Sequence, residues 1–147
     1  MLKLLVADDE RILREAVCYL IDWKSIGIEL AASCKNGREA YEEACRTKPD
    51  IILTDIKMPG LSGLDLVEKL SEPGRVLEFI LLTGYADFEY AHRALSHRVH
   101  HYLLKPCNEQ QIIEAVQQAA QSIYTRRQLQ QMEPTCAGVA RPEYSET

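Results

Sequence analysis

The sequence predicts an α/β fold in which helices cover both faces of a five-stranded parallel sheet. Short apolar runs alternate five times with segments in which apolar residues recur every three or four positions. Only a few residues separate each strand from the next helix, which is typical of parallel βαβ units. A length of 147 residues fits one domain with a sizeable hydrophobic core.

The first half of the chain contains three of these strands and two of the helices. Apolar runs predict strands over residues 2–7, 26–32 and 51–54. Helical periodicity starts at Glu10 and continues to Ile21. Asn36, followed three residues later by Glu39, is expected to cap a second helix that ends near Arg46. The run at 51–54 has consecutive apolar residues, which is typical of a strand buried on both faces.

The second half continues the alternation. Its expected elements are a loop over 58–63, a helix over 64–70, a strand over 77–82, a helix capped by Asp87, a strand over 101–104 and a long helix opened by Asn108 and Gln111. From about residue 133 the periodicity is lost, and we expect a disordered tail there.

Composition argues against several classes of protein. A net charge of −5 does not favour a chain that coats nucleic acid. No apolar run approaches the roughly 18 residues that span a bilayer, and no secretory signal is evident, so we expect a cytoplasmic protein without membrane contact. The five cysteines are scattered and lack metal-ligand spacing, which indicates reduced thiols.

Polar residues follow the predicted strands. Asp8 and Asp9 follow the first strand, Asp55 the third, Thr83 the fourth and Lys105 the fifth. Because the working site of such sheets lies at the carboxyl ends of the strands, we expect these residues to converge. Two carboxylates about 4 Å apart repel by roughly 4 kcal/mol at an effective dielectric constant of about 20. Lys105 offsets part of this repulsion, and a hard cation such as Mg²⁺ would offset the rest.

This site is acidic where nucleotide-binding folds have a glycine-rich turn, so it would repel a bare phosphate. A metal-bound phosphoryl group is different, because the ion reverses the local charge. A carboxylate that faces magnesium, a lysine and a hydroxyl is a plausible phosphoryl acceptor, since carboxylates can form aspartyl-phosphate intermediates.

Four motifs occur in order at the expected strand ends: Asp8-Asp9, DIKMPG at 55–60, TGY at 83–85 and YLLKP at 102–106. Each alone has an ordinary explanation, such as helix capping by the first pair. Together they resemble the response regulator receiver domain of two-component signalling, over residues 1–126. Three more stretches, IDW at 21–23, PDIILTD at 49–55 and GYADFEY at 84–90, are similar to the YesN/AraC-type subgroup.

The resemblance implies a flavodoxin-like strand order of 2-1-3-4-5 and assigns roles at the acidic site. Asp55 matches the phosphoryl acceptor, and Asp9 matches a direct magnesium ligand. Asp8 matches a ligand that acts mainly through water, and Lys57 sits where a backbone carbonyl completes the metal site. Lys105 matches the ammonium group that pairs with the phosphoryl group.

The resemblance also implies a switch. Thr83 matches a hydroxyl that closes on the phosphoryl group, Tyr102 matches an aromatic that then turns inward, and the bond before Pro106 is expected to be cis. A purely packing role for the tyrosine is the alternative. Two positions depart from the family pattern, Arg98 where glycine is usual and His101 where a small or acidic residue is commoner.

The expected function is therefore a phosphorylation-activated switch and not a metabolic enzyme. A sensor histidine kinase would phosphorylate Asp55, and the face formed by helix four, strand five and helix five would control an output or form a homodimer. In the subgroup a DNA-binding region follows the receiver; residues 127–147 would then be a linker or disordered tail, with the output domain absent from this chain. The alternatives are a degenerate receiver that acts through protein contacts alone, and a small phosphatase, which would have an acid where Lys57 stands.

Overall fold

The structure is a computed structural model that describes residues 1–72, 74–84, 99 and 101–136. Its strands are β1 (Leu2–Ala7), β2 (Ile28–Cys34), β3 (Ile51–Asp55), β4 (Glu78–Thr83) and β5 (His101–Leu104). They form one sheet in the order β2-β1-β3-β4-β5, and every neighbouring pair is parallel. The described helices are α1 (Arg11–Tyr19), η1 (Trp23–Ile26, a 3-10 helix), α2 (Gly37–Thr47), α3 (Gly63–Leu70) and α5 (Glu109–Cys136). The predicted fold class and strand order are confirmed.

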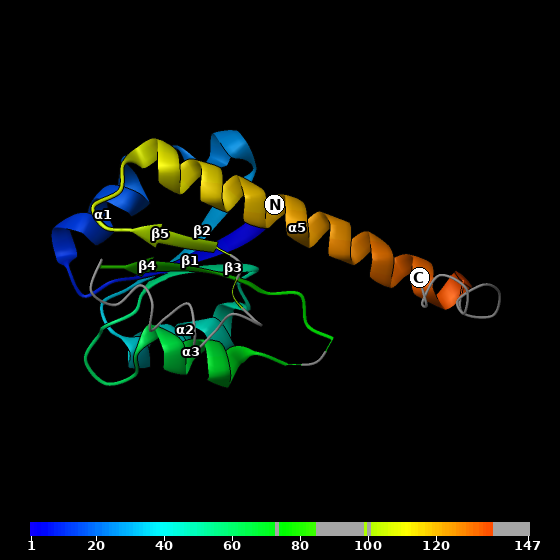
Figure 1. Ribbon diagram of the computed structural model, residues 1–147, viewed down its shortest axis with the longest axis horizontal. Coiled ribbons are helices and arrows are strands. Elements are labelled where there is room, and N and C mark those ends of the chain that lie inside the picture. The colour runs from blue at the N-terminus through cyan, green and yellow to red at the C-terminus, as the bar shows by residue number, and fades with distance from the viewer. Residues whose placement is uncertain (73, 85–98, 100, 137–147) are drawn as a thin grey trace.

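The helices form one layer on each face of the sheet (Figure 1). Helices α1 and α5 cover one face, and α2 and α3 cover the other. Leu4 and Leu5 are neighbours in β1, yet each is fully buried in a different apolar cluster. Successive side chains of a strand point to opposite faces, so both faces need apolar residues. The same pattern makes all of β3 buried, as the sequence predicts.

The second strand starts later than the sequence indicates. Residues 23–26 form η1, and Gly27 ends this turn in the left-handed region at φ 81°. Trp23 is buried, and its Nε1 donates a hydrogen bond to the carbonyl of Val17. The prediction that Ile26 opens a strand is therefore wrong, because the apolar side chain of Ile26 packs from a helical turn instead.

Helix capping follows the sequence closely. The Asn36 side chain accepts a hydrogen bond from the backbone N–H of Glu39, as expected. Asn108 and Gln111 each accept from the other's backbone N–H, which makes the predicted reciprocal cap of α5. Helix α3 starts at Gly63, within the predicted loop, because Ser62 and Asp65 form a capping box there.

Helix α5 is longer than the sequence predicts. It runs without a break to Cys136, so the expected loss of helical structure near residue 133 is wrong. Its last turns extend beyond the sheet (Figure 1). The boundary between a receiver unit and a linker after residue 126 stays a prediction. No described helix has the length and apolar character needed to cross a membrane.

Some predicted features lie outside the described residues. These are the helix capped by Asp87, the unusual Arg98, and the tail from residue 137 onwards.

Candidate functional site

The carboxyl ends of β1, β3, β4 and β5 bring together the polar residues that the sequence singles out. Asp8 and Asp9 follow β1, Asp55 is the last residue of β3, and Lys105 follows β5. Each of the three aspartates offers one carboxylate oxygen, and these oxygens lie within 4.8 Å of one another. The Lys105 Nζ lies 2.9 Å from the Asp55 Oδ2. The predicted convergence is therefore present.

Backbone contacts fix the Asp55 carboxylate at the end of its strand. The N–H of Ile56 donates to Asp55 Oδ1 at 2.8 Å, and Lys105 contacts the other oxygen. The following loop folds back tightly, since the N–H of Gly63 donates to the Ile56 carbonyl at 2.8 Å. A Cβ atom on Gly63 would lie 2.4 Å from the Asp55 carbonyl oxygen, so only glycine fits there. Asp55 is 9% exposed, so a small part of this residue stays accessible at the surface of the site.

Asp8 is the most enclosed carboxylate of the group. It is 1% exposed, and its Oδ1 accepts a hydrogen bond from the N–H of Glu10 at 2.9 Å. Its Oδ2 accepts no hydrogen bond from the described residues and lies 3.5 Å from the Lys105 Nζ. Burial raises the pKa of Asp8, and the Glu10 N–H and the Lys105 charge oppose that rise only in part.

Lys105 is the cation at the centre of the acidic group. Its Nζ contacts Asp55 at 2.9 Å, Glu10 at 3.2 Å and Asp8 at 3.5 Å. Burial lowers the pKa of Lys105, but the hydrogen bond and charge of Asp55, with those of Asp8 and Glu10, outweigh it and raise the pKa above its usual value. The ammonium group therefore stays charged at neutral pH.

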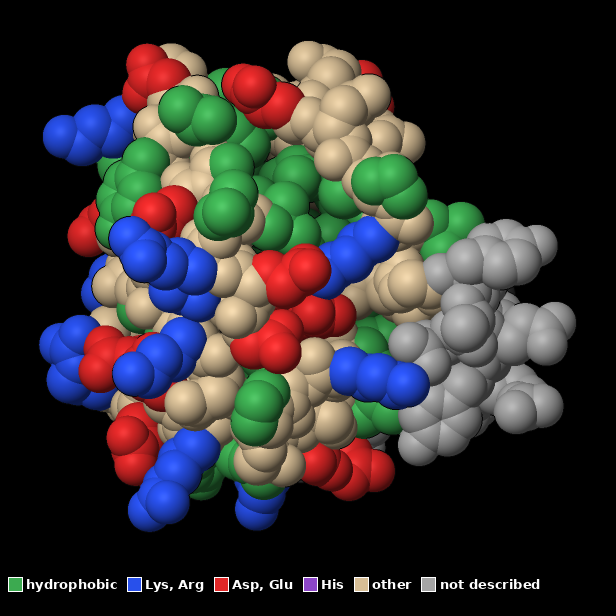
Figure 2. All heavy atoms as spheres, turned by 90° about the vertical axis from the view of Figure 1, so that its left-hand side faces the viewer, with side chains coloured by type: hydrophobic (Ala, Val, Ile, Leu, Met, Phe, Trp, Pro, Cys, Tyr) green, Lys and Arg blue, Asp and Glu red, His purple; other side chains and the backbone are tan. Residues whose placement is uncertain are grey.

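Glu10 is a site residue that the sequence did not reveal. It is the N-cap residue before α1, and its position next to Asp8-Asp9 is typical of a helix start. Its side chain nevertheless makes no capping hydrogen bond within the described residues and contacts Lys105 instead. Three carboxylates thus contact the Lys105 ammonium group, and Asp9 lies beside two of them. Acidic side chains gather at the centre of this face (Figure 2).

The residues assigned to the switch lie beside this group. Thr83 is fully buried, its hydroxyl donates to the Gly84 carbonyl at 3.1 Å, and its own carbonyl accepts from the N–H of Lys105 at 2.9 Å. Tyr102 is half-buried and packs against the cluster on the α2–α3 face, and burial raises the pKa of its hydroxyl. The Lys105–Pro106 peptide bond is cis, as the resemblance implies.

Lys57 has an exposed side chain, and the role of its backbone carbonyl stays a prediction. It lines a shallow depression with Asp9, Met58, Pro59 and Ser62 at the edge of the acidic group.

The donor set fits a hard divalent cation. Carboxylate oxygens are the ligands that Mg²⁺ prefers, and the Asp8 Oδ2 is a buried acceptor to which no described group donates. Such an atom is costly unless a cation or a donor satisfies it. Asp8, Asp9 and Asp55 are the residues that would hold the ion, and the resemblance adds the backbone carbonyl of Lys57.

The chain matches a family model and many known proteins. The model described as the response regulator receiver domain matches residues 4–117. The transcriptional regulatory protein YesN of Bacillus subtilis is 48% identical over 118 residues, which is 80% of this chain and 32% of that protein. The transcriptional regulatory protein HptR of Staphylococcus aureus is 35% identical over 112 residues, 76% of this chain and 44% of that protein. The chain thus spans less than half the length of these relatives.

Solved structures agree with this likeness. The receiver domain of AraT, a response regulator from Geobacillus stearothermophilus, is 36% identical, with a TM-score of 0.78 over 86% of this chain and 98% of that one. A two-component transcriptional regulator AraC from Clostridium phytofermentans is 28% identical, with a TM-score of 0.80 over the same shares.

The pairing of Lys105 with Asp55 can be measured by a double-mutant cycle. Lys105→Met, Asp55→Asn and the double variant should show a coupling of about 1–3 kcal/mol in urea unfolding with chelator present, because both groups are mostly buried. The control cycle uses Arg11→Met and Glu15→Gln, an exposed pair on α1, and should give no more than about 0.5 kcal/mol. Equal coupling in the two cycles would contradict the central role of Lys105.

Proposed function

The chain belongs to the response regulator receiver domain family, and on this basis we propose that it accepts a phosphoryl group on Asp55 from a sensor histidine kinase in a magnesium-dependent reaction. The observation that carries this proposal is the position of Asp55: a carboxylate at the end of a buried strand, 2.9 Å from the Lys105 ammonium and beside Asp8 and Asp9.

In this step the phosphoryl group moves from a histidine nitrogen of the kinase to a carboxylate oxygen of Asp55. A carboxylate oxygen of Asp55 forms a bond to phosphorus as the phosphorus–nitrogen bond of a phosphohistidine breaks, and the imidazole leaves with a proton. Contacts from Ile56 and Lys105 hold the carboxylate in place before the donor arrives, which reduces the entropy cost of the reaction. Lys105 then faces the negative charge of the transferred group. Bound Mg²⁺ would supply further positive charge at the phosphoryl oxygens.

The domain would catalyse its own phosphorylation, and in time its own dephosphorylation, without turning over a metabolite. In the hydrolysis, water bonds to the phosphorus of the aspartyl phosphate as the bond from phosphorus to the Asp55 oxygen breaks. Inorganic phosphate leaves, and the carboxylate is restored.

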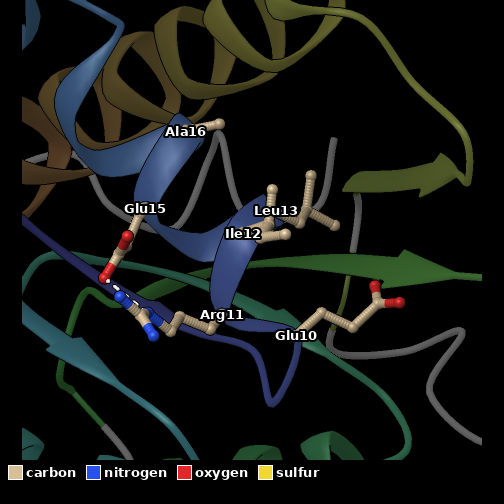
Figure 3. Close-up of a pocket in the computed structure, with 6 residues that line it drawn as sticks. All are labelled: Glu10, Arg11, Ile12, Leu13, Glu15 and Ala16. Carbon is tan, nitrogen blue, oxygen red and sulfur yellow. Dashed lines mark hydrogen bonds and ion pairs between the residues drawn. The ribbon is translucent and has the colours of Figure 1, made fainter.

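A protein donor needs a surface beside Asp55, and helix α1 offers one. Ile12 is 85% exposed and Leu20 is 74% exposed, both unusually high for large apolar residues. A groove between α1 and α5 is lined by Leu13, Ala16, Val17, Leu20, Ile21, Cys107, Glu109 and Ile112. Apolar side chains lie next to the acidic centre (Figure 2), and Glu10, Ile12 and Leu13 point to the same side of the first turn of α1 (Figure 3). This surface fits a helical kinase element that presents its histidine to Asp55.

The output would leave from the opposite side of the site. Phosphate on Asp55 brings new acceptor oxygens toward the end of β4, where Thr83 carries the nearest hydroxyl on that strand. A rotation of Thr83 would vacate space beside β5, into which Tyr102 could turn. This change would reshape the face of β5 and α5, which would control homodimerisation. In a longer protein it would also control a DNA-binding region, since the curated relatives are transcription regulators.

Phosphorylation of Asp55 is the first test. Incubation with phosphoramidate and Mg²⁺ should add one phosphoryl group by intact mass, and Asp55→Asn should show no addition. Asp22→Asn, an exposed aspartate at the start of η1, serves as the matched control and should be modified like the parent. Modification that persists in Asp55→Asn would refute the assignment, and no modification of the parent would favour a degenerate receiver.

Magnesium should stabilise the fold, because it relieves carboxylate repulsion. The expected gain is about 2.7 kcal/mol at a hundredfold excess over Kd, measured by thermal unfolding with Mg²⁺ and with chelator. Asp9→Asn should reduce this gain more than Asp8→Asn, since Asp9 is the proposed direct ligand. Glu29→Gln, an exposed change at the start of β2, is the control and should keep the full gain. Identical melting temperatures with and without Mg²⁺ would exclude the metal site.

If Thr83 acts as the switch, its substitution should separate phosphorylation from the structural change that follows it. Thr83→Ala should still gain one phosphoryl group, yet lose much of the spectral change that phosphorylation causes in the parent, because the hydroxyl that follows the phosphate is missing. Coupling of this kind is worth typically about 1–3 kcal/mol. NMR shifts in the parent should concentrate in residues 83–107 and the start of α5; Thr83→Ser, which keeps the hydroxyl, should preserve them. Shifts confined to α1 and α2 would overturn this route.

A further inference from the structure

The buried carboxylate of Glu78 links β4, β5 and α5 at the amino-terminal ends of the strands, at the opposite end of the sheet from the acidic site. Glu78 is the first residue of β4, and its side chain is 2% exposed. Its Oε1 lies 3.1 Å from the Nε2 of His101, the first residue of β5. Its Oε2 accepts a hydrogen bond from the guanidinium of Arg126 on α5. One side chain therefore contacts both β5 and the C-terminal part of α5.

Two further polar contacts hold the same part of the helix. The Arg127 guanidinium lies 2.5 Å from the Asp50 Oδ1 at the start of β3, and the Gln130 side chain donates to the Gly74 carbonyl at 3.1 Å. The described side chains from residue 124 to residue 130 are all exposed, whereas Ile123 is fully buried. From residue 124 to residue 130 the helix is thus attached by polar contacts, with Glu78 as the buried member.

We propose that Glu78 is a positioning residue that couples β5 to the last turns of α5, so that the phosphorylation state of Asp55 is read out at residues 126–130. This rests on the proposed function, because it names the path by which that switch would reach the end of the chain. His101 is the neighbour of Tyr102 in β5, and β5 pairs with β4 at Ile80 opposite His101. Because His101 and Tyr102 are adjacent in β5, a backbone shift of β5 that accompanies the turn of Tyr102 would also move the side chain that holds one oxygen of Glu78.

The coupling follows from the cost of a buried charge. A buried carboxylate is stable only while its oxygens are paired, and loss of one partner leaves an uncompensated charge. When β5 moves His101, the Glu78 carboxylate must adjust toward the remaining donors, of which Arg126 is one. Arg126 lies in the segment 124–130 of α5, where every side chain is exposed, so this segment is the part able to respond.

The static contact is tested first, in the unphosphorylated chain. Glu78→Gln and Arg126→Gln should each speed hydrogen exchange of the amides at 126–130 by about tenfold or more, because the buried attachment of the helix end is lost. Arg126 is partly exposed, so its substitution leaves the core intact. Arg126→Gln therefore still tests the contact if Glu78→Gln fails to fold. The control Glu68→Gln, at an exposed position on α3, should leave this exchange unchanged. Unchanged exchange in Arg126→Gln would overturn the proposal.

The coupling is tested by phosphorylation, with intact mass followed in the same samples. In the parent, phosphorylation should change the exchange at 126–130; His101→Leu should gain the phosphoryl group but lose that change, and His101→Gln, which keeps a donor, should restore it. A phosphorylated parent with unaltered exchange overturns the coupling while the proposed function stands. A parent that gains no mass refutes the proposed function and, with it, the coupling.

Discussion

The repulsion among carboxylates at one edge of a parallel sheet is the constraint on which the rest of this structure depends. Asp8, Asp9, Glu10 and Asp55 meet there because parallel strands end at the same edge, and Lys105 contacts three of them. One ammonium group cannot balance four carboxylates. Among the described residues, the site is therefore short of positive charge, and a cation or a cation-bound phosphoryl group is the ligand that would correct it.

The surrounding fold keeps these charges in place despite their repulsion. A strand with every residue buried cannot slide without exposing apolar side chains, so Asp55 stays at the end of β3. The close return of the loop at Gly63 and the N–H of Ile56 then fix the direction of its carboxylate. Rigidity in β3 thus suits Asp55 to the acceptor role proposed for it, because a carboxylate free to turn would move away from its acidic neighbours.

The sequence predicts the parts of this arrangement that depend on local pattern. The buried strands, the cap at Asn36 and the carboxylates at strand ends follow from apolar runs and short spacings, and the structure agrees with them. The start of β2 was missed, because Ile26 is apolar in either a strand or a turn and only Gly27 marks the difference. The roles of Glu10 and Glu78 were missed for another reason: their partners lie 95 and 48 residues away, and only the folded chain brings them together.

The two edges of the sheet solve the problem of buried charge in opposite ways. At the edge of Glu78 the chain supplies its own donors, His101 and Arg126, so the carboxylate needs nothing from solution. At the edge of Asp55 the donors are too few, and the Asp8 Oδ2 accepts no hydrogen bond from the described residues. Strands β4 and β5 run between these edges, only a few residues long. A charge added at the edge of Asp55 therefore acts on two short strands whose other ends are held by the paired charge of Glu78. Short strands held in this way can transmit a small displacement across the domain.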